Sequence, residues 1–181
     1  MHEHLKRVLV VGSSSSGKTS FAWQLAAILA CKPVELDDLF WGPNWTPRPE
    51  AEFRSLAEAA IAGPDWVVDG NYGVLRTLLW PRATSVIWLN YGFLTVFLRA
   101  LRRTIRRIAY RERLFSGNRE SFGEAFLSRK SILYWVITTH GRKRREFEEL
   151  RRSGQFPQLQ WLEFRQPSDA ENFLREMQGA K

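Results

Sequence analysis

Residues 8–26, VLVVGSSSSGKTSFAWQLA, decide the fold of this chain because three local signals follow one another within them. Residues 8–11 are β-branched and aliphatic, which is typical of a buried parallel strand. Residues 12–19 then match the pattern G-x-x-x-x-G-K-[ST]. Apolar side chains recur at helical spacing from Phe21 to Leu29. The stretch therefore predicts a strand, a tight loop and a helix in that order.

The glycine- and serine-rich loop has the composition of a phosphate-binding site. Consecutive backbone N–H groups and the N-terminus of the following helix form a positive cradle for a β-phosphate. Lys18 is expected to span the β- and γ-phosphates, and the Thr19 hydroxyl to hold Mg²⁺. A chance serine-rich turn before a helix is the alternative. We expect ATP and Mg²⁺ as cofactors, with these nucleotide-binding residues: Gly12, Ser13, Ser14, Ser15, Ser16, Gly17, Lys18, Thr19 and Ser20.

The positive charge of the chain is concentrated in one block. The sequence has 27 basic and 19 acidic residues, a formal net charge of +8. Residues 71–111 contain eight arginines and no acidic residue, so the rest of the chain is neutral. The planar fork of arginine suits phosphate or carboxylate, which makes nucleotides, phosphorylated metabolites or nucleic acid the partners to consider. A solvated positive face is the alternative interpretation.

The composition excludes several classes of protein. A chain of 181 residues, 44% hydrophobic, with eight Trp and twelve Phe, predicts one globular domain over residues 1–181 rather than a disordered chain. Cys31 alone forms no internal disulfide, and three scattered histidines lack a zinc spacing. The longest apolar stretch, residues 21–31, is too short to cross a bilayer, and the N-terminus shows no cleavage site. We therefore expect a cytoplasmic protein with no membrane partner.

Strand and helix signals alternate along the rest of the chain. Further strands are predicted over residues 33–36, 66–68, 85–89 and 159–164, and further helices over residues 50–62, 93–108, 121–152 and 168–177. Residues 37–49, DDLFWGPNWTPRP, hold three prolines, so we expect a rigid, non-helical loop. The alternation predicts an α/β domain with a parallel sheet.

The helix predicted over residues 93–108 carries two rows of side chains spaced four residues apart. One row is apolar and runs from Phe93 to Ile105. The opposite row is basic and consists of Arg99, Arg103 and Arg107. Apolar positions also recur along the long helix that follows, where Leu133 and Ile137 are expected in the core.

A small kinase is the class that best fits a phosphate-binding loop in a chain of this length. Motors and transporters need additional domains, and a GTPase would show an N-K-x-D string, which this sequence lacks. Catalysis in such kinases is mostly positioning and charge neutralisation around the transferred phosphoryl group. The sequence therefore favours a kinase over the other nucleotide-binding classes.

Several runs together resemble the bacterial adenylate-kinase-like P-loop family often labelled "DNA topology modulation protein". They are VLVVGSSSSGKTSFAWQLA (8–26), VELDDLFWGPNW (34–45), WVVDGNY (66–72) and SGNRESFGEAFLSRKSILYW (116–135). The likeness covers nearly the whole chain, and the order of parts is more loosely similar to adenylate and shikimate kinases. It implies a P-loop NTPase fold with a five-stranded parallel sheet, an acceptor-binding insertion at about 37–63 and an arginine-rich lid at about 104–121.

The resemblance gives roles to two acidic residues. Asp69 stands where nucleoside monophosphate kinases carry the aspartate of D-G-F-P-R, so it would hold Mg²⁺ through water. An Asp-Gly turn is the alternative for Asp69. Residues 35–37, E-L-D, resemble the D-x-D segment of shikimate kinases, so Asp37 would orient an acceptor hydroxyl or accept its proton. A helix N-cap is the alternative for Asp37 or Asp38.

The resemblance also gives roles to arginines. Adenylate kinases carry arginines just before the lid, where they pack on adenine or reach phosphate, and Arg99 and Arg103 match these positions. Arg107, Arg111 and Arg119 would belong to the lid. The catalytic candidates are therefore Lys18, Asp37, Arg99, Arg103, Arg107 and Arg119. Asp37 is also a candidate for acceptor binding, and weaker candidates for that part are Arg54, Asn71 and Arg76. Arg165 is a candidate for nucleotide binding, because it lies in the loop where related kinases wrap the adenine.

Two departures from the family pattern carry consequences. Ser15 stands where most relatives have glycine, so a positive φ there would cost about 1 kcal/mol. Residues 69–76, DGNYGVLR, replace D-G-F-P-R, which argues against AMP as the acceptor. We expect transfer of the γ-phosphoryl group to a small-molecule or nucleotide acceptor. The alternatives are a polynucleotide 5′-hydroxyl kinase and an ATP-binding regulatory or DNA-associated protein, disfavoured because the arginine block lacks interleaved aromatic residues.

Overall fold

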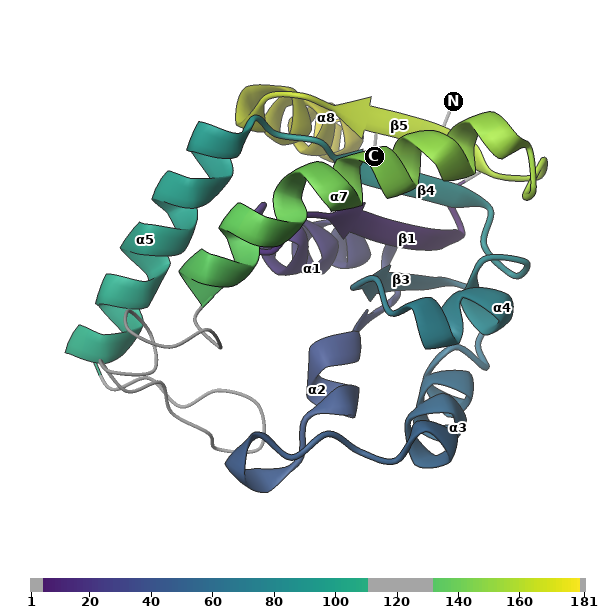
Figure 1. Cartoon of the computed structure of the whole chain (residues 1–181). Helices are drawn as coiled ribbons and strands as arrows, with labels where there is room; N and C mark the ends of the chain where they lie inside the picture. The colour runs from purple at the N-terminus through teal and green to yellow at the C-terminus, as the bar shows by residue number, and fades with distance from the viewer. Residues whose placement is uncertain (1–4, 111–131, 180–181) are drawn as a thin grey trace.

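The β-branched run near the N-terminus forms the central strand of a parallel sheet. A computed structural model describes residues 5–110 and 132–179 (Figure 1). Within them the strands are β1 (Arg7–Gly12), β2 (Lys32–Glu35), β3 (Trp66–Asp69), β4 (Ser85–Leu89) and β5 (Gln160–Phe164). All neighbours pair in parallel, in the order β2-β3-β1-β4-β5. The predicted five-stranded parallel sheet is confirmed.

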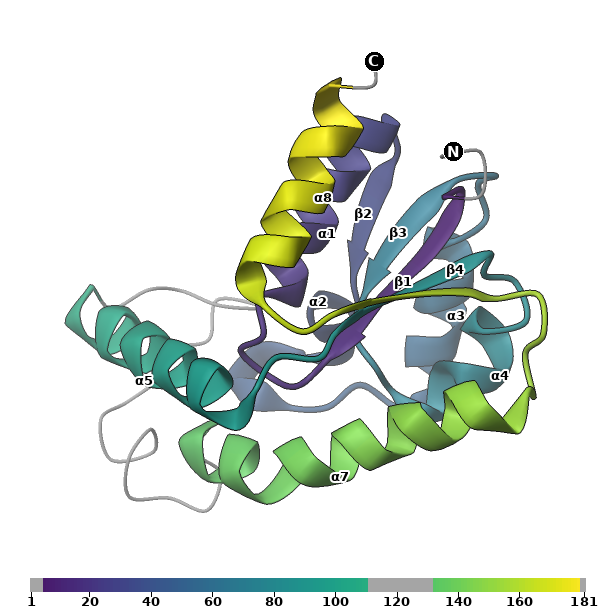
Figure 2. The ribbon, with the colours of Figure 1, turned by 90° about the horizontal axis from the view of Figure 1, so that it is seen from above.

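Helices cover both faces of this sheet. The helices of four or more residues are α1 (Lys18–Leu29), α2 (Leu36–Phe40), α3 (Glu50–Ala60), α4 (Arg76–Leu79), α5 (Phe93–Ala109), α7 (Ile132–Ser153) and α8 (Pro167–Gly179). Figure 2 shows α1 and α8 on one side of the sheet, with α3, α4 and α7 on the other. Because both faces are covered, β1 reads as an unbroken apolar run. No helix among the described residues is long and apolar enough to span a membrane.

Alternate side chains of β1 supply two separate hydrophobic cores. Val8 and Val10 pack with α1 and α8, whereas Leu9 and Val11 pack with α3, α4 and Phe147 of α7. Successive residues of a strand point to opposite faces, so one short run anchors both layers. The loop that follows β1 is therefore held at the carboxyl edge of the sheet by packing on both sides.

The prediction of a non-helical loop over residues 37–49 is wrong in part. Leu36–Phe40 forms the helix α2, and Pro43–Trp45 forms a 3₁₀ turn, η1. The first proline of this stretch is Pro43, so the residues before it are free to complete one helical turn. The sequence also gave no signal for the 3₁₀ turn η2 (Gly73–Leu75) or for α4. The long helix predicted from residue 121 is described from Ile132 onward, and residues 121–131 lie outside the described chain.

Helix α5 does not pack through its apolar row. Phe93 and Ile105 are 43% and 53% exposed, and the fully buried side chains are Val96, Ala100 and Thr104. These smaller side chains lie between the apolar and basic rows and permit close contact with α7. In α7 the buried side chain near the predicted positions is Val136, whereas Ile137 is exposed. The expectation that Ile137 lies in the core is therefore wrong.

Candidate active site

The glycine- and serine-rich loop turns sharply between β1 and α1. Gly12 has φ +151°, and a Cβ there would lie 2.7 Å from the carbonyl oxygen of Leu89. Gly17 has φ +93° and directly precedes α1. Ser15 has φ +66°, so this serine adopts the left-handed conformation. Residues in these conformations orient successive N–H groups into an anion-binding concavity.

Two cationic side chains contact this loop. The Lys18 Nζ donates a hydrogen bond of 3.1 Å to the Ser13 carbonyl oxygen, so its ammonium lies over the loop. Arg99, from α5, donates from Nη1 to the Ser16 carbonyl oxygen at 3.0 Å. The Arg99 guanidinium also lies 5.3 Å from the Tyr91 ring centroid, within cation–π range. A residue eighty-three positions away in sequence thus brings a second positive charge to the phosphate-binding loop.

Thr19 and Asp69 meet at the carboxyl edge of the sheet. Asp69 ends β3, pairs in register with Val10 of β1, and is 7% exposed. Its Oδ2 accepts a hydrogen bond from the Thr19 hydroxyl, and its Oδ1 has no hydrogen-bond partner among the described residues. Burial raises the pKa of Asp69, while the Lys18 charge and the Thr19 hydrogen bond oppose that shift.

These two oxygen-bearing side chains fit Mg²⁺. Magnesium prefers oxygen ligands and usually takes one or two from protein, with water and substrate phosphates supplying the rest. The described residues contain no group of three or more His, Cys, Asp or Glu side chains placed to hold a metal. A hydroxyl, a carboxylate with one unpartnered buried oxygen and a phosphate-binding loop are therefore the donor set that a Mg-nucleotide complex requires.

Asp37 and Tyr72 form a second polar pair beside Asp69. The Tyr72 hydroxyl donates to Asp37 Oδ1 at 2.6 Å. Burial, followed by the charge of Asp37, raises the pKa of Tyr72, so its hydroxyl remains a donor. Asp37 lies in the first turn of α2, where no side chain caps the helix, so the capping alternative does not apply to it. Sequence reasoning missed Tyr72, because no motif assigns a function to an aromatic residue two positions after an Asp-Gly pair.

Asn71 is the remaining polar residue at this edge. Its side-chain nitrogen and oxygen are both buried, and neither has a hydrogen-bond partner among the described residues. Gly70, which links Asn71 to β3, has φ +130°, and a Cβ there would lie 2.9 Å from the Leu36 Cβ. The tight turn against Leu36 is thus what sets Asn71 beside Asp69.

Comparison with known proteins bears on the fold. No protein-family model and no curated protein matches this chain. Among solved structures, a shikimate kinase from Bacteroides thetaiotaomicron is similar, with a TM-score of 0.51 over 97% of each chain and 14% sequence identity. The chain shares the overall fold of that structure. The resemblance to the topology-modulation family stays a prediction.

Three of the predicted arginines contact other parts of the protein. Arg54 donates to the Val74 carbonyl oxygen at 3.4 Å and to the Thr77 hydroxyl at 3.3 Å. Arg76 forms an ion pair with Glu146 of α7. Arg165 is 72% exposed and bonds to Glu163 at 2.9 Å. No contact joins these three to the phosphate-binding loop among the described residues.

The remaining predicted residues lie on α5, on α1 or outside the described chain. Arg103 and Arg107 follow Arg99 by one and two turns of α5 and are partly buried. Arg111 and Arg119, with most of the lid predicted over residues 104–121, lie outside the described residues. The Ser20 hydroxyl accepts a hydrogen bond of 3.2 Å from Gln24 within α1.

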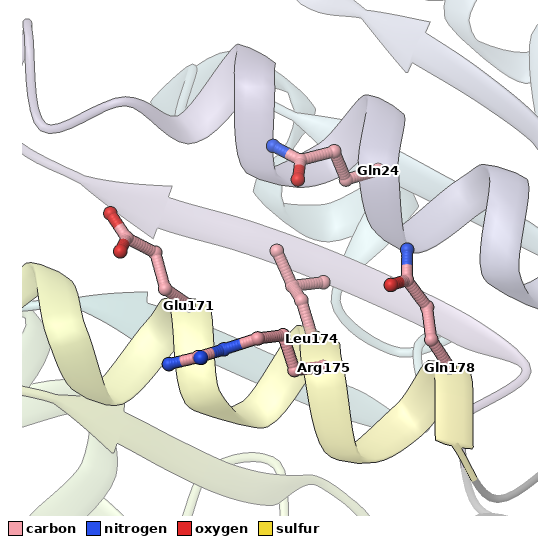
Figure 3. A pocket seen from close by; sticks show the side chains of 5 residues that line it. All are labelled: Gln24, Glu171, Leu174, Arg175 and Gln178. Atoms are coloured by element: carbon pink, nitrogen blue, oxygen red, sulfur yellow. The ribbon is translucent and has the colours of Figure 1, made fainter.

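A surface hollow of about 390 Å³ lies between α1 and α8 (Figure 3). It is lined by Gln24, Glu171, Leu174, Arg175 and Gln178. Helices α1 and α8 cover the face of the sheet opposite to α3 and α4, and none of the predicted site residues lines this hollow. It is therefore separate from the candidate active site.

Proposed function

We propose that this protein is a Mg-ATP-dependent kinase that transfers the γ-phosphoryl group to a hydroxyl of a small-molecule or nucleotide acceptor. The observation that carries the proposal is the position of three groups at one edge of the sheet. These are the Lys18 ammonium over the loop, the Thr19–Asp69 pair, and the Asp37–Tyr72 pair. Phosphate binding, metal binding and acceptor activation each need one of them.

Each residue has a distinct part in this proposal. Lys18 and the backbone N–H groups of residues 13–19 bind the β- and γ-phosphates, and Arg99 adds positive charge from α5. Thr19 and Asp69 would hold Mg²⁺, which when bound neutralises charge on the phosphates. Further charge would come from Arg103 and Arg107 on the same helix. Preorganised positive groups stabilise the charge that develops on the transferred group.

Asp37 is the proposed proton acceptor. Its carboxylate lies at the start of α2, and the Tyr72 hydrogen bond fixes one of its oxygens. In the step, the acceptor oxygen forms a bond to the γ-phosphorus and the bond from that phosphorus to the β–γ bridging oxygen breaks. ADP leaves, and the proton of the acceptor hydroxyl passes to Asp37. Tyr72 serves as a positioning residue because it acts on Asp37 rather than on the acceptor.

The test is Mg²⁺-dependent ADP release from ATP with a panel of hydroxyl acceptors. Wild type is compared with Lys18→Ala and with Lys6→Ala, which removes an exposed lysine outside the site. We expect Lys18→Ala to lower the rate of acceptor-stimulated ADP release by at least about 100-fold, because the variant lacks the positive charge that stabilises the transferred phosphoryl group. Lys6→Ala should match wild type. Circular dichroism checks the fold of both variants, and a folded Lys18→Ala with full turnover would contradict the proposal.

A further inference from the structure

The segment that surrounds the acceptor side is acidic although the chain as a whole is basic. Residues 35–69 contain two arginines, no lysine and eight acidic residues, a formal net charge of −6 in a chain of +8. The acidic residues are Glu35, Asp37, Asp38, Glu50, Glu52, Glu58, Asp65 and Asp69. The excess positive charge lies instead in residues 71–111, which include α5. Glu52 and Glu58 form ion pairs with Arg48 and Arg82, and Asp65 precedes β3 at the amino edge of the sheet, so the carboxylates at the acceptor edge are Glu35, Asp37, Asp38 and Asp69. At this edge an acceptor would meet negative charge, whereas α5 brings positive charge to the nucleotide.

Carboxylates lie close to one another at the acceptor edge of the sheet. Glu35 of β2 is the register partner of Asp69, and its Oε1 accepts from the Trp23 indole N–H. Asp37 follows Glu35 by two residues in the first turn of α2, and its Oδ1 accepts from the Tyr72 hydroxyl. Asp38 is exposed on α2 beside Asp37. An anionic group brought here would be repelled by each of these charges.

The arginines that would offset this charge are engaged within the protein. Arg48 forms an ion pair with Glu52 at 2.8 Å, and Arg54 bonds to Val74 and Thr77. Arg76 forms an ion pair with Glu146. Recognition of a phosphate or carboxylate relies on arginine forks that are free to bind it. Binding an anionic acceptor through these residues would first require breaking their contacts.

An aromatic cluster completes this side of the site. The Phe40 ring lies 4.7 Å from Tyr72 and 4.8 Å from Trp41, and the Trp41 ring lies 5.7 Å from Trp45. Tyr72 joins the cluster to Asp37 through its hydroxyl. Aromatic rings pack on planar or apolar groups and attract cations. Rings beside carboxylates therefore suit an uncharged or positively charged molecule.

We propose that the acceptor is a hydroxyl compound without an anionic group, uncharged or cationic, such as a nucleoside, a sugar or an amino alcohol. This inference rests on the kinase function proposed above and names the class of its acceptor. The hydroxyl faces Asp37, and the body of the molecule lies between the α2 carboxylates and the aromatic cluster. The amide of Asn71 has no hydrogen-bond partner among the described residues, and its NH₂ group and carbonyl oxygen offer donors and an acceptor to such a neutral molecule.

The test is an acceptor panel built from matched pairs that differ in an anionic group. The pairs are adenosine and adenosine 3′-monophosphate, glucosamine and N-sulfoglucosamine, and ethanolamine and glycolate, so that each anionic partner keeps a primary hydroxyl, and a 5′-hydroxyl oligonucleotide serves as a polyanion. We expect phosphorylation of at least one uncharged or cationic member, with kcat/KM at least about tenfold above that of its anionic partner. A preference for anionic members, or binding of Mg-ATP with no phosphorylation of any uncharged or cationic member, would overturn the inference.

The two proposals fail in different ways. Calorimetry measures Mg-ATP binding to wild type and to Lys18→Ala without any acceptor. Absence of Lys18-dependent binding overturns the kinase function itself. Phosphorylation of an anionic member alone leaves the kinase function intact and overturns only the acceptor class.

A pair of charge-reversal variants tests the electrostatic argument directly. Asp38→Lys changes the charge beside Asp37, and Glu176→Lys makes the same change on α8, on the opposite face of the sheet. Both side chains are exposed, so both variants are expected to fold. Asp38→Lys should lower the preference for the uncharged or cationic member by about tenfold, and Glu176→Lys should leave it unchanged. Equal preferences in the two variants would overturn the inference.

Discussion

At the scale of single residues, Ser15 has a backbone conformation that is unfavourable for serine. Its φ of +66° costs about 1–2 kcal/mol for a residue with a Cβ, and its buried Oγ has no partner among the described residues. Glycine loses about 0.5–1 kcal/mol more backbone entropy on folding. The conformational relief is the larger effect, so Ser15→Gly should raise the free energy of unfolding by about 0.5–1 kcal/mol, measured by urea denaturation.

Ser14→Gly is the matched control for this prediction. Ser14 lies in the same loop but does not have a positive φ, so glycine brings the entropy loss without the conformational gain. We expect Ser14→Gly to lower the free energy of unfolding by about 0.5–1 kcal/mol. Equal shifts of the same sign in the two variants would contradict the account of Ser15.

The sequence anticipated some of these residues and not others. A positive φ at Ser15 was raised only as a condition, from the glycine that the resembled family carries there, and the structure has it. The motif gave Thr19 and the resemblance gave Asp69 as residues for Mg²⁺, and the structure joins the two by a hydrogen bond. The Tyr72–Asp37 hydrogen bond spans 35 residues and depends on the turn at Gly70, which no local pattern encodes.

At the scale of elements, one ion pair ties α4 to α7. Burial would raise the pKa of Glu146, but hydrogen bonds from Lys143 and Arg76 outweigh burial and lower it. Because the folded pKa is depressed, the pair stabilises the protein above the ordinary carboxyl range and loses this contribution as pH falls through the folded pKa. We expect Arg76→Ala to lower the free energy of unfolding by about 1 kcal/mol at pH 7, since Lys143 still pairs with Glu146.

The pH dependence distinguishes this structural part of Arg76 from acceptor binding. The difference in the free energy of unfolding between wild type and Arg76→Ala should be constant above about pH 5 and should become smaller toward pH 3. Urea denaturation across that range measures it. Arg152→Ala, on the exposed end of α7, should stay within about 0.5 kcal/mol of wild type throughout. An unchanged stability together with a raised acceptor KM would instead identify Arg76 as an acceptor-binding residue.

Among the helices, the longer ones were predictable. The helix expected over residues 50–62 is Glu50–Ala60, because about three turns show a clear period. Helix α2 and the 3₁₀ turns are too short to show one. The packing face of α5 was not predictable from hydrophobicity, since α7 approaches it along Val96, Ala100 and Thr104. Close approach of two backbones favours small side chains over large apolar ones.

At the scale of the whole molecule, the order of strands explains why charge is divided along the chain. β1 lies at the centre, with β3 and β2 to one side and β4 and β5 to the other. The acidic residues 35–69 run from the end of β2 to the end of β3, and α5 follows β4 on the other side. The loop after β1 therefore lies between the acidic segment 35–69 and the basic helix α5.

Nucleotide binding at this central loop should stabilise the whole fold. A ligand that binds only the native state at 100 times its Kd adds about 2.7 kcal/mol. Each kcal/mol raises the Tm of a chain of this size by about 2–4 °C, so saturating Mg-ATP should raise the Tm by about 5–10 °C in calorimetry. Lys18→Ala should lose most of this rise in Tm, because the Lys18 ammonium over the loop supplies positive charge that binds the phosphates. Glu176→Lys, whose charge change lies on α8, should keep it. An equal rise in Lys18→Ala would place the nucleotide away from the loop, since a ligand stabilises the native state only through contacts that it makes there.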